Sequence, residues 1–359
     1  MKYKLLAIII TVMLVLTACG PKETVKPTDS VSAFPVVVDS SQDTYPAGDA
    51  VDTATEDTYP IAETVAQDIY PVSSGEAISI TVLAPSSTTS IPILLAAKYL
   101  PGMTVEIFDN HPQAHAQFMA EDNLVLVTGL SVGVDMFKND VPLQLINTNV
   151  TGLSYLVSCN LEINSFADLA GHEIYLPFEG SPLEETTRFF VEQAGLQYGV
   201  DVKPIYAPFD TSTALIKNGD DAIVAMPQPA ATAMAAQECG HLGASFYDTW
   251  NAITGDTDGY PQVGAFAKAE FASAHPEWVQ AFNQAVAKAI ADLQANPEAA
   301  VNEVADKFSF PAPVLLQALQ ATRFTVQSDQ AMKDSVIHYY VTIGKPLDES
   351  YEAFFYALP

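Results

Sequence analysis

Residues 165–188 read S-F-A-D-L-A-G-H-E-I-Y-L-P-F-E-G-S-P-L-E-E-T-T-R. Gly171 is predicted to end the structural element before it, and residues 172–176 are predicted to form a β-strand. Pro177 has no N–H for a strand ladder, so a short buried strand is predicted to end there.

A helix start follows this strand. Ser181 has the residue type of an N-cap, Pro182 stands at the first helical position, and Glu184 lies three residues after the cap. Gly180 supplies the loop between strand and helix. Such a junction turns free backbone N–H groups toward the carboxyl end of the strand, where open α/β sheets bind their ligands. Taken alone, the junction is equally a plain helix start.

Similar strand-loop-helix junctions are predicted elsewhere. In each, a buried strand is followed by a polar or proline-bearing loop. The strand at 78–84 leads to five consecutive serine and threonine residues at 86–90. The strand at 124–127 leads to Thr128 and Gly129, and the strand at 221–226 leads to Gln228 and Pro229. Ser90 and Ser131 are predicted to begin helices after the first two loops.

The order of these motifs resembles a known family. D-L-A-G at 168–171, P-F-E-G-S at 177–181 and K-N-G-D-D-A-I-V-A-M-P-Q-P at 217–229 resemble segments of the second lobe in bacterial ABC-transporter solute-binding proteins. This group includes the sulfonate-, nitrate- and thiamine-precursor-binding proteins. The likeness runs from about Ile78 to the end of the chain.

The resemblance implies an α/β, two-lobe periplasmic-binding-protein type 2 fold. Each lobe would be a mixed sheet flanked by helices, and a two-strand hinge would join the lobes around an enclosed solute. The implied ligand-binding residues are Ser86, Ser87, Thr88, Thr128, Gly129, Tyr155, Gly180, Ser181, Pro182, Gln228 and Pro229. Relatives often carry an acidic residue where this chain has Gln228, so the charge preference stays open.

The expected domain limits follow the composition and the hinge crossings. They are a signal peptide at 1–18, a lipidated flexible Thr/Asp/Pro tether at 19–77, the first part of lobe 1 at 78–152, lobe 2 at 153–248, and the rest of lobe 1 at 249–359. Residues 151–157 and 246–261 are the two predicted crossings, and the chain after the strand at 263–267 is predicted to be helical.

The N-terminus and the charge suggest an exported protein. Lys2 and Lys4 precede an apolar run at 5–16, and Leu16-Thr17-Ala18-Cys19 resembles a lipobox in which Cys19 carries lipid. Lys and Arg total 15 against 43 Asp and Glu, a net charge of −28. This charge repels phosphate, so nucleic acid is excluded as a partner.

Few residues suggest catalysis or a metal. The chain contains no G-x-S-x-G, no H-E-x-x-H and no phosphate loop with lysine. His111 and His115 are four apart but are interpreted as surface histidines, and no cofactor or metal is expected. Cys159 and Cys239 can pair in an exported protein, and the sequence does not decide whether they do.

The predicted function is that of an extracytoplasmic solute-binding component of an ABC importer. It would be a monomer, anchored to the cell membrane by lipid, with a membrane permease as partner. Six aromatic residues are candidates for stacking walls: Tyr155, Phe178, Tyr206, Phe209, Tyr247 and Trp250.

Helix N-termini favour an anionic solute, whereas Glu179, Glu184 and Glu185 disfavour one. A small organic solute that is neutral, zwitterionic or weakly anionic is therefore expected, sulfonate-like, pyrimidine-like or otherwise heteroaromatic. The alternatives are a pyrimidine-precursor-synthase-like enzyme of the same fold, which uses histidine, lysine and pyridoxal phosphate, and a surface adhesion or structural lipoprotein.

Overall fold

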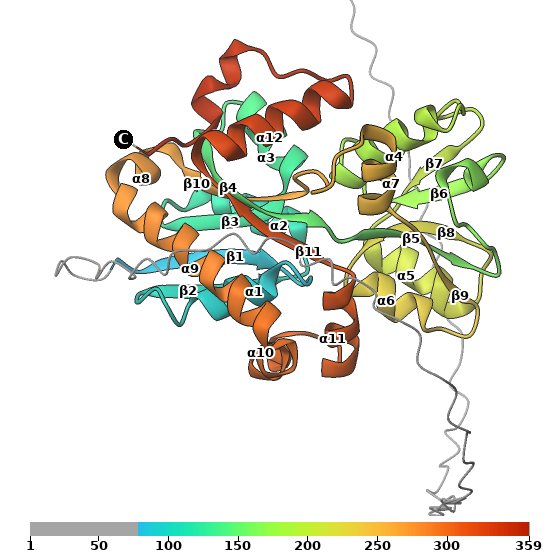
Figure 1. Cartoon of the computed structure of the whole chain (residues 1–359), viewed down its shortest axis with the longest axis horizontal. Coiled ribbons are helices and arrows are strands. Elements are labelled where there is room, and N and C mark those ends of the chain that lie inside the picture. Colours follow the sequence, from blue (N-terminus) through green and yellow to red (C-terminus); the bar gives the residue numbers. More distant parts are fainter. Residues whose placement is uncertain (1–77, 359) are drawn as a thin grey trace, which may run out of the picture. The chain divides into compact units, whose positions relative to one another are not determined.

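The structure is a computed structural model that describes residues 78–358. The predicted signal peptide, the tether and the lipidated Cys19 lie outside the described residues. Two sheets form the described part, and each is surrounded by helices (Figure 1). The mixed α/β architecture predicted from the sequence is confirmed.

The first sheet has six strands in the order β11-β4-β10-β3-β1-β2. Its strands are β1 Ile80–Pro85, β2 Met103–Phe108, β3 Leu124–Gly129, β4 Leu143–Gly152, β10 Val263–Lys268 and β11 Arg323–Gln327. β1 runs parallel to β2 and β3, whereas β10 runs antiparallel to β3 and β4. Such a mixed sheet allows strands that are far apart in sequence to become neighbours.

Helices cover both faces of this sheet (Figure 1). One apolar core includes residues of α1 Ser90–Ala96, α8 Ala269–Ala274, α9 Pro276–Ala295, α10 Pro297–Val304 and α11 Ala312–Gln320. A second includes residues of α2 His111–Ala120, α3 Leu130–Lys138 and α12 Asp329–Thr342. The described residues also contain three short 3-10 helices: Phe166–Leu169, Ala305–Lys307 and Glu349–Phe354.

The second sheet has five strands in the order β7-β6-β8-β5-β9. They are β5 Ser154–Cys159, β6 Glu173–Leu176, β7 Lys203–Tyr206, β8 Ile223–Pro227 and β9 Gly240–Ser245. Residues of α4 Pro182–Gln193 and α7 Phe246–Thr254 pack in the second apolar core, and residues of α5 Phe209–Asn218 and α6 Ala230–Ala235 pack in a third. We call the first sheet with its helices lobe 1 and the second sheet with α4 to α7 lobe 2.

Two of the predicted elements differ in the structure. The chain after β10 is not all helical, because β11 pairs antiparallel with β4. The predicted return crossing at 246–261 begins as the helix α7, which also contains the expected boundary between residues 248 and 249. Ser245 caps this helix by accepting a hydrogen bond from Asp248 N, a local signal present in the sequence.

The lobes are joined by two adjacent crossings. Leu153 is the one residue between β4 and β5, and residues 255–262 lead back from α7 to β10. The side chain of Gln262 ties the crossings together, since its Oε1 accepts from Leu153 N at 3.3 Å and its Nε2 donates to Thr151 O at 3.3 Å. Leu153 O in turn accepts from Gln228 N at 2.9 Å.

A disulfide joins Cys159 on β5 to Cys239 just before β9, with Cα atoms 4.8 Å apart. It closes a segment of 80 residues that contains most of lobe 2. Within residues 78–358, no helix combines the length and the apolar character needed to cross a bilayer.

Candidate functional site

A cavity of about 590 Å³ is lined by residues of both lobes. This volume lies within the range of small-molecule sites, about 300–1,000 Å³. The loops after β1, β3, β6 and β8 all contribute to its wall. Eight of the predicted site residues line it: Ser86, Ser87, Thr128, Gly129, Ser181, Pro182, Gln228 and Pro229. The four strand-loop-helix junctions therefore meet at one cavity, and ligand binding by these residues stays a prediction.

Three predicted site residues, Thr88, Tyr155 and Gly180, do not line the cavity, and each makes a contact between the lobes instead. The backbone N–H of Thr88 donates to Gln228 O at 3.2 Å. The hydroxyl of Tyr155 donates to Ala321 O at 3.0 Å, and Gly180 O accepts from Ser131 Oγ at 3.0 Å.

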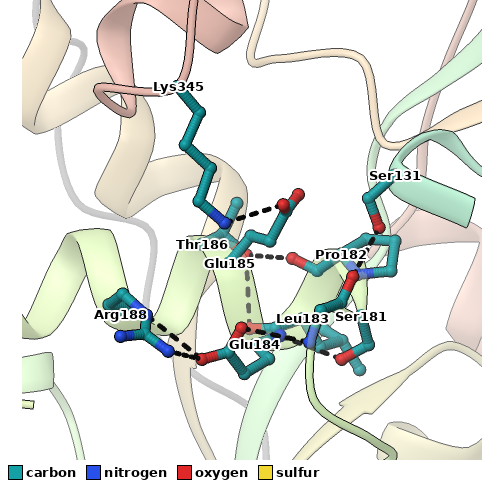
Figure 2. Close-up of polar contacts among 10 residues, drawn as sticks. Ser131, Ser181, Pro182, Leu183, Glu184, Glu185, Thr186, Arg188 and Lys345 are labelled. Atoms are coloured by element: carbon teal, nitrogen blue, oxygen red, sulfur yellow. Dashed lines mark hydrogen bonds and ion pairs between the residues drawn. The ribbon is translucent and has the colours of Figure 1, made fainter. Parts of the chain in front are cut away.

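The start of α4 is built as the sequence predicts. Ser181 Oγ accepts a hydrogen bond from Glu184 N at 3.1 Å, and Pro182 occupies the first helical position (Figure 2). Ser181 and Pro182 belong to the cavity wall, so the N-terminal end of this helix lies at the cavity. The dipole of the helix favours negative charge and hydrogen-bond acceptors at this end.

The helices that follow β1 and β3 begin differently from the prediction. Ser90 is the first residue of α1 and not its cap, because its hydroxyl donates to Pro85 O. The N-cap position belongs to Thr89, whose side chain caps nothing. α3 begins at Leu130, before Ser131, and Gly129 holds its N-cap position.

The glutamates at α4 are held in ion pairs outside the cavity wall. Glu184 contacts Arg188 Nη2 at 2.5 Å, and Glu185 contacts Lys345 Nζ at 2.8 Å (Figure 2). Burial raises the pKa of Glu185, and the hydrogen bond from Lys345 opposes this rise. The expected repulsion of an anion by Glu184 and Glu185 is therefore weaker than the sequence suggests, since neither residue lines the cavity and each has a cationic partner.

Three residues that line the cavity each have a buried side-chain atom that finds no hydrogen-bond partner within residues 78–358: Ser87 Oγ, Thr89 Oγ1 and Gln228 Nε2. Gln228 is 0% exposed, and its Oε1 accepts from Thr232 N at 3.1 Å. That bond fixes the orientation of the carboxamide and leaves Nε2 free to donate.

The apolar part of the wall contains an aromatic group from both lobes. The rings of Phe108 and His111 meet edge to face with centroids 5.0 Å apart, and those of His111 and Phe209 are 6.4 Å apart. Of the six predicted stacking aromatics, Phe178 and Phe209 line the cavity. Trp250 is wholly buried in the core, packed against Tyr260 and Tyr339.

Sequence reasoning missed many of the wall residues, among them Phe108, His111, Tyr260, Gln262 and Phe310. Phe108 ends β2, and His111 begins the helix after it. The same strand-loop-helix rule that singled out Ser86 and Thr128 applies to this junction and would have found both.

The two histidines of α2 are partly buried, so their interpretation as surface residues was wrong. Burial lowers the pKa of His111, and burial together with the neighbouring His111 lowers the pKa of His115 to about 4. His115 Nε2 lies 3.3 Å from Thr128 Oγ1. Among residues 78–358, no three His, Cys, Asp or Glu side chains are grouped closely enough to hold a metal ion.

Comparison with known proteins finds the same fold in periplasmic binding proteins. Residues 141–300 match the model of a family described as NMT1/THI5 like. No curated protein is significantly similar to the chain in sequence.

Solved structures resemble the fold over most of its length. The periplasmic aliphatic sulphonate binding protein SsuA from Escherichia coli has a TM-score of 0.63 and 16% identity, covering 78% of this chain and 92% of its own. The alkanesulfonate-binding SsuA from Xanthomonas axonopodis pv. citri, bound to MOPS, has a TM-score of 0.61 and 16% identity, covering 76% and 96%.

The periplasmic nitrate-binding protein NrtA from Synechocystis PCC 6803 has a TM-score of 0.56 and 16% identity, covering 72% of this chain and 75% of its own. At such identities these likenesses establish the fold. The resemblance to the sulfonate- and nitrate-binding group of ABC solute-binding proteins, predicted from the sequence, is confirmed.

Proposed function

We propose that the protein is the extracytoplasmic solute-binding component of an ABC importer. It would capture a small organic solute between its lobes and deliver it to a membrane permease. The observation that carries this proposal is the cavity, because loops from two separate sheets line the same space. The likeness to periplasmic sulphonate- and nitrate-binding proteins supports it.

The location and the partners belong to the same proposal. Cys19 would carry the lipid anchor and residues 19–77 would form the tether, so that a monomer reaches its permease at the outer face of the membrane. A net charge of −28 keeps such a chain away from anionic lipid surfaces, which makes a covalent anchor useful.

The solute class follows from the mixed character of the wall. The wall contains residues with hydroxyl and amide groups as well as the aromatic residues Phe108, Phe178 and Phe209. A small solute with a polar group on a flat or apolar body, sulfonate-like, pyrimidine-like or otherwise heteroaromatic, matches both parts.

Native mass spectrometry of the protein, purified without refolding, tests the proposal. A bound small molecule is expected, and differential scanning fluorimetry should show a rise in melting temperature with at least one sulfonate, pyrimidine, flavin or amino acid. The proposal fails if no molecule is retained and none of these compounds shifts the melting temperature. An absorbance band of bound pyridoxal phosphate would favour the enzyme alternative instead.

A further inference from the structure

His111 stands on the cavity wall at a point that both lobes build. It begins α2 of lobe 1, and its ring meets the ring of Phe108 edge to face with centroids 5.0 Å apart. The ring of Phe209, on α5 of lobe 2, lies 6.4 Å from the imidazole. All three residues line the cavity, so the imidazole belongs to a group of rings that spans the two lobes.

The imidazole keeps surface that a solute can reach. His111 is half-buried, whereas Gln228 on the same wall is buried. Within residues 78–358 neither ring nitrogen of His111 has a hydrogen-bond partner, although the neighbouring His115 Nε2 lies 3.3 Å from Thr128 Oγ1. The nitrogens of His111 are also absent from the buried side-chain atoms that lack a partner. Both nitrogens therefore retain accessible surface on a residue that lines the cavity.

The hydrogen-bonding capacity of this ring follows from its charge state. Burial lowers the pKa of His111, and the negative charge of Asp109 opposes this change. The lowered pKa favours the neutral ring at pH 7. A neutral imidazole has one nitrogen that donates a hydrogen bond and one that accepts. His111 can therefore bond a group that donates or a group that accepts, without carrying charge into the cavity.

The charges near this group of rings disfavour an anion. Two carboxylates, Asp109 and Asp210, lie on the cavity wall and are exposed, and each directly follows one of the two phenylalanines in the chain. The one lysine of the wall, Lys217, lies two turns further along α5, about 12 Å from Phe209 by helical rise. An uncharged hydroxyl or amino group therefore fits beside the imidazole better than a sulfonate or a carboxylate.

We propose that His111 is a specificity-determining residue of the cavity, whose imidazole hydrogen-bonds an uncharged hydroxyl or amino group on a flat solute that packs against Phe108 and Phe209. This inference rests on the proposed solute-binding function and specifies which solutes the site selects. It favours the heteroaromatic solute over the sulfonate-like one, and it assigns that choice to one side chain.

Matched probes that differ in one group test this inference. The pairs are 3-hydroxypyridine with pyridine, and 2-aminopyrimidine with pyrimidine, measured with the full-length protein by isothermal titration calorimetry at pH 7. In at least one pair, the compound with the hydroxyl or amino group is expected to bind about two- to tenfold more tightly, as for one neutral hydrogen bond. Pyridine-3-sulfonate should bind more weakly than 3-hydroxypyridine. Equal binding within both pairs, tighter binding of the sulfonate, or no binding of any probe overturns the inference.

Variants of His111 separate hydrogen bonding from packing. His111→Phe keeps a ring beside Phe108 and Phe209 but removes both nitrogens, so the preference within a pair should vanish while pyridine and pyrimidine keep their affinity within about twofold. His111→Asn keeps a polar group near the position of Nδ1, and His111→Gln keeps one near that of Nε2. One of these two variants should recover part of the preference.

The matched control is His275→Phe. His275 also packs beside a phenylalanine, Phe271, with ring centroids 4.9 Å apart, but it does not line the cavity. This variant should keep the wild-type preference. A preference that persists in His111→Phe, or an equal loss of affinity for both members of a pair, overturns the inference, because the ring would then act only by packing.

The outcome for the proposed function is independent. A solute retained on purification whose affinity is the same in the wild type and in His111→Phe would overturn the role of His111 and leave the solute-binding function supported. Absence of any retained solute and of any stabilising compound would remove both.

Discussion

Gly129 and Pro182 face each other across the lobes, and Gly129→Ala tests whether the lobes must close on the solute. The added Cβ would lie 2.5 Å from Pro182 Cγ, which is about 1 Å inside an ordinary carbon–carbon contact. Gly129 has φ −59° and ψ 141°, a conformation that any residue adopts without strain. The substitution therefore leaves each lobe intact and holds the lobes apart.

The expected loss of affinity follows from the contacts between the lobes. Ser131 Oγ donates to Gly180 O at 3.0 Å, and Thr88 N donates to Gln228 O at 3.2 Å. A separation of about 1 Å breaks both bonds, at a net cost of about 0.5–1.5 kcal/mol each. Closure then becomes less favourable by about 1–3 kcal/mol, and solute affinity falls about 5- to 150-fold.

Isothermal titration calorimetry on Gly129→Ala, Pro182→Ala and the double variant measures this loss, with the solute retained on purification or found by fluorimetry. Pro182→Ala removes Cγ and Cδ, and the remaining Cβ lies 3.7 Å from the new methyl group, an ordinary contact. The double variant should therefore recover the wild-type affinity within about twofold. Wild-type affinity in Gly129→Ala, or no recovery in the double variant, would refute the reasoning, as would a large fall in the ligand-free melting temperature.

The remaining predictions concern stability and are checked by urea unfolding. Replacing Cys159 and Cys239 by serine should lower the free energy of unfolding by about 2–4 kcal/mol, and reduction of the wild type should reproduce the loss; an unchanged midpoint would show that the bridge contributes nothing. Lys345→Met leaves the buried Glu185 carboxylate unpaired and should cost about 1–2 kcal/mol at pH 7. Because burial raises the pKa of Glu185, the cost should shrink as the pH falls and the group is protonated, and Glu185→Gln should remove it; a cost that grows at low pH would contradict this. His115 has its pKa lowered from 6.5 to about 4, so the stability that its neutral form contributes is complete above pH 6.5 and is lost as the pH falls toward 4. His115→Gln should reduce this acid loss by roughly 2 kcal/mol, allowing for partial exposure of the ring, and an equal acid loss in both proteins would argue against it.

Local signals predicted the parts of the site that are built locally. Ser181, Pro182 and Glu184 specify the start of α4 through contacts between residues close in the chain, and the structure has that cap. The junctions at Ser86, Thr128 and Gln228 were predictable for a related reason. Each follows a buried strand, and the carboxyl end of a strand in an α/β sheet opens toward the ligand crevice.

Long-range contacts explain what the sequence could not supply. β11 lies beside β4 although about 170 residues separate them, and no local pattern distinguished its sequence from the surrounding helices. The ion pair of Glu185 depends on the distant Lys345. Trp250 and Phe209 are both aromatic, and tertiary packing alone places one in the core and the other on the cavity wall.

The backbone hydrogen bond from Gln228 N to Leu153 O has a consequence for how the cavity wall moves when the lobes open. Leu153 lies at the pivot between the sheets, and points close to a pivot travel little when the two halves swing. Gln228, bonded to it through the backbone, would therefore hold nearly the same position in an open molecule as in a shut one. The part of the cavity wall formed by Gln228 would then keep its place while the rest of the wall moves apart and together.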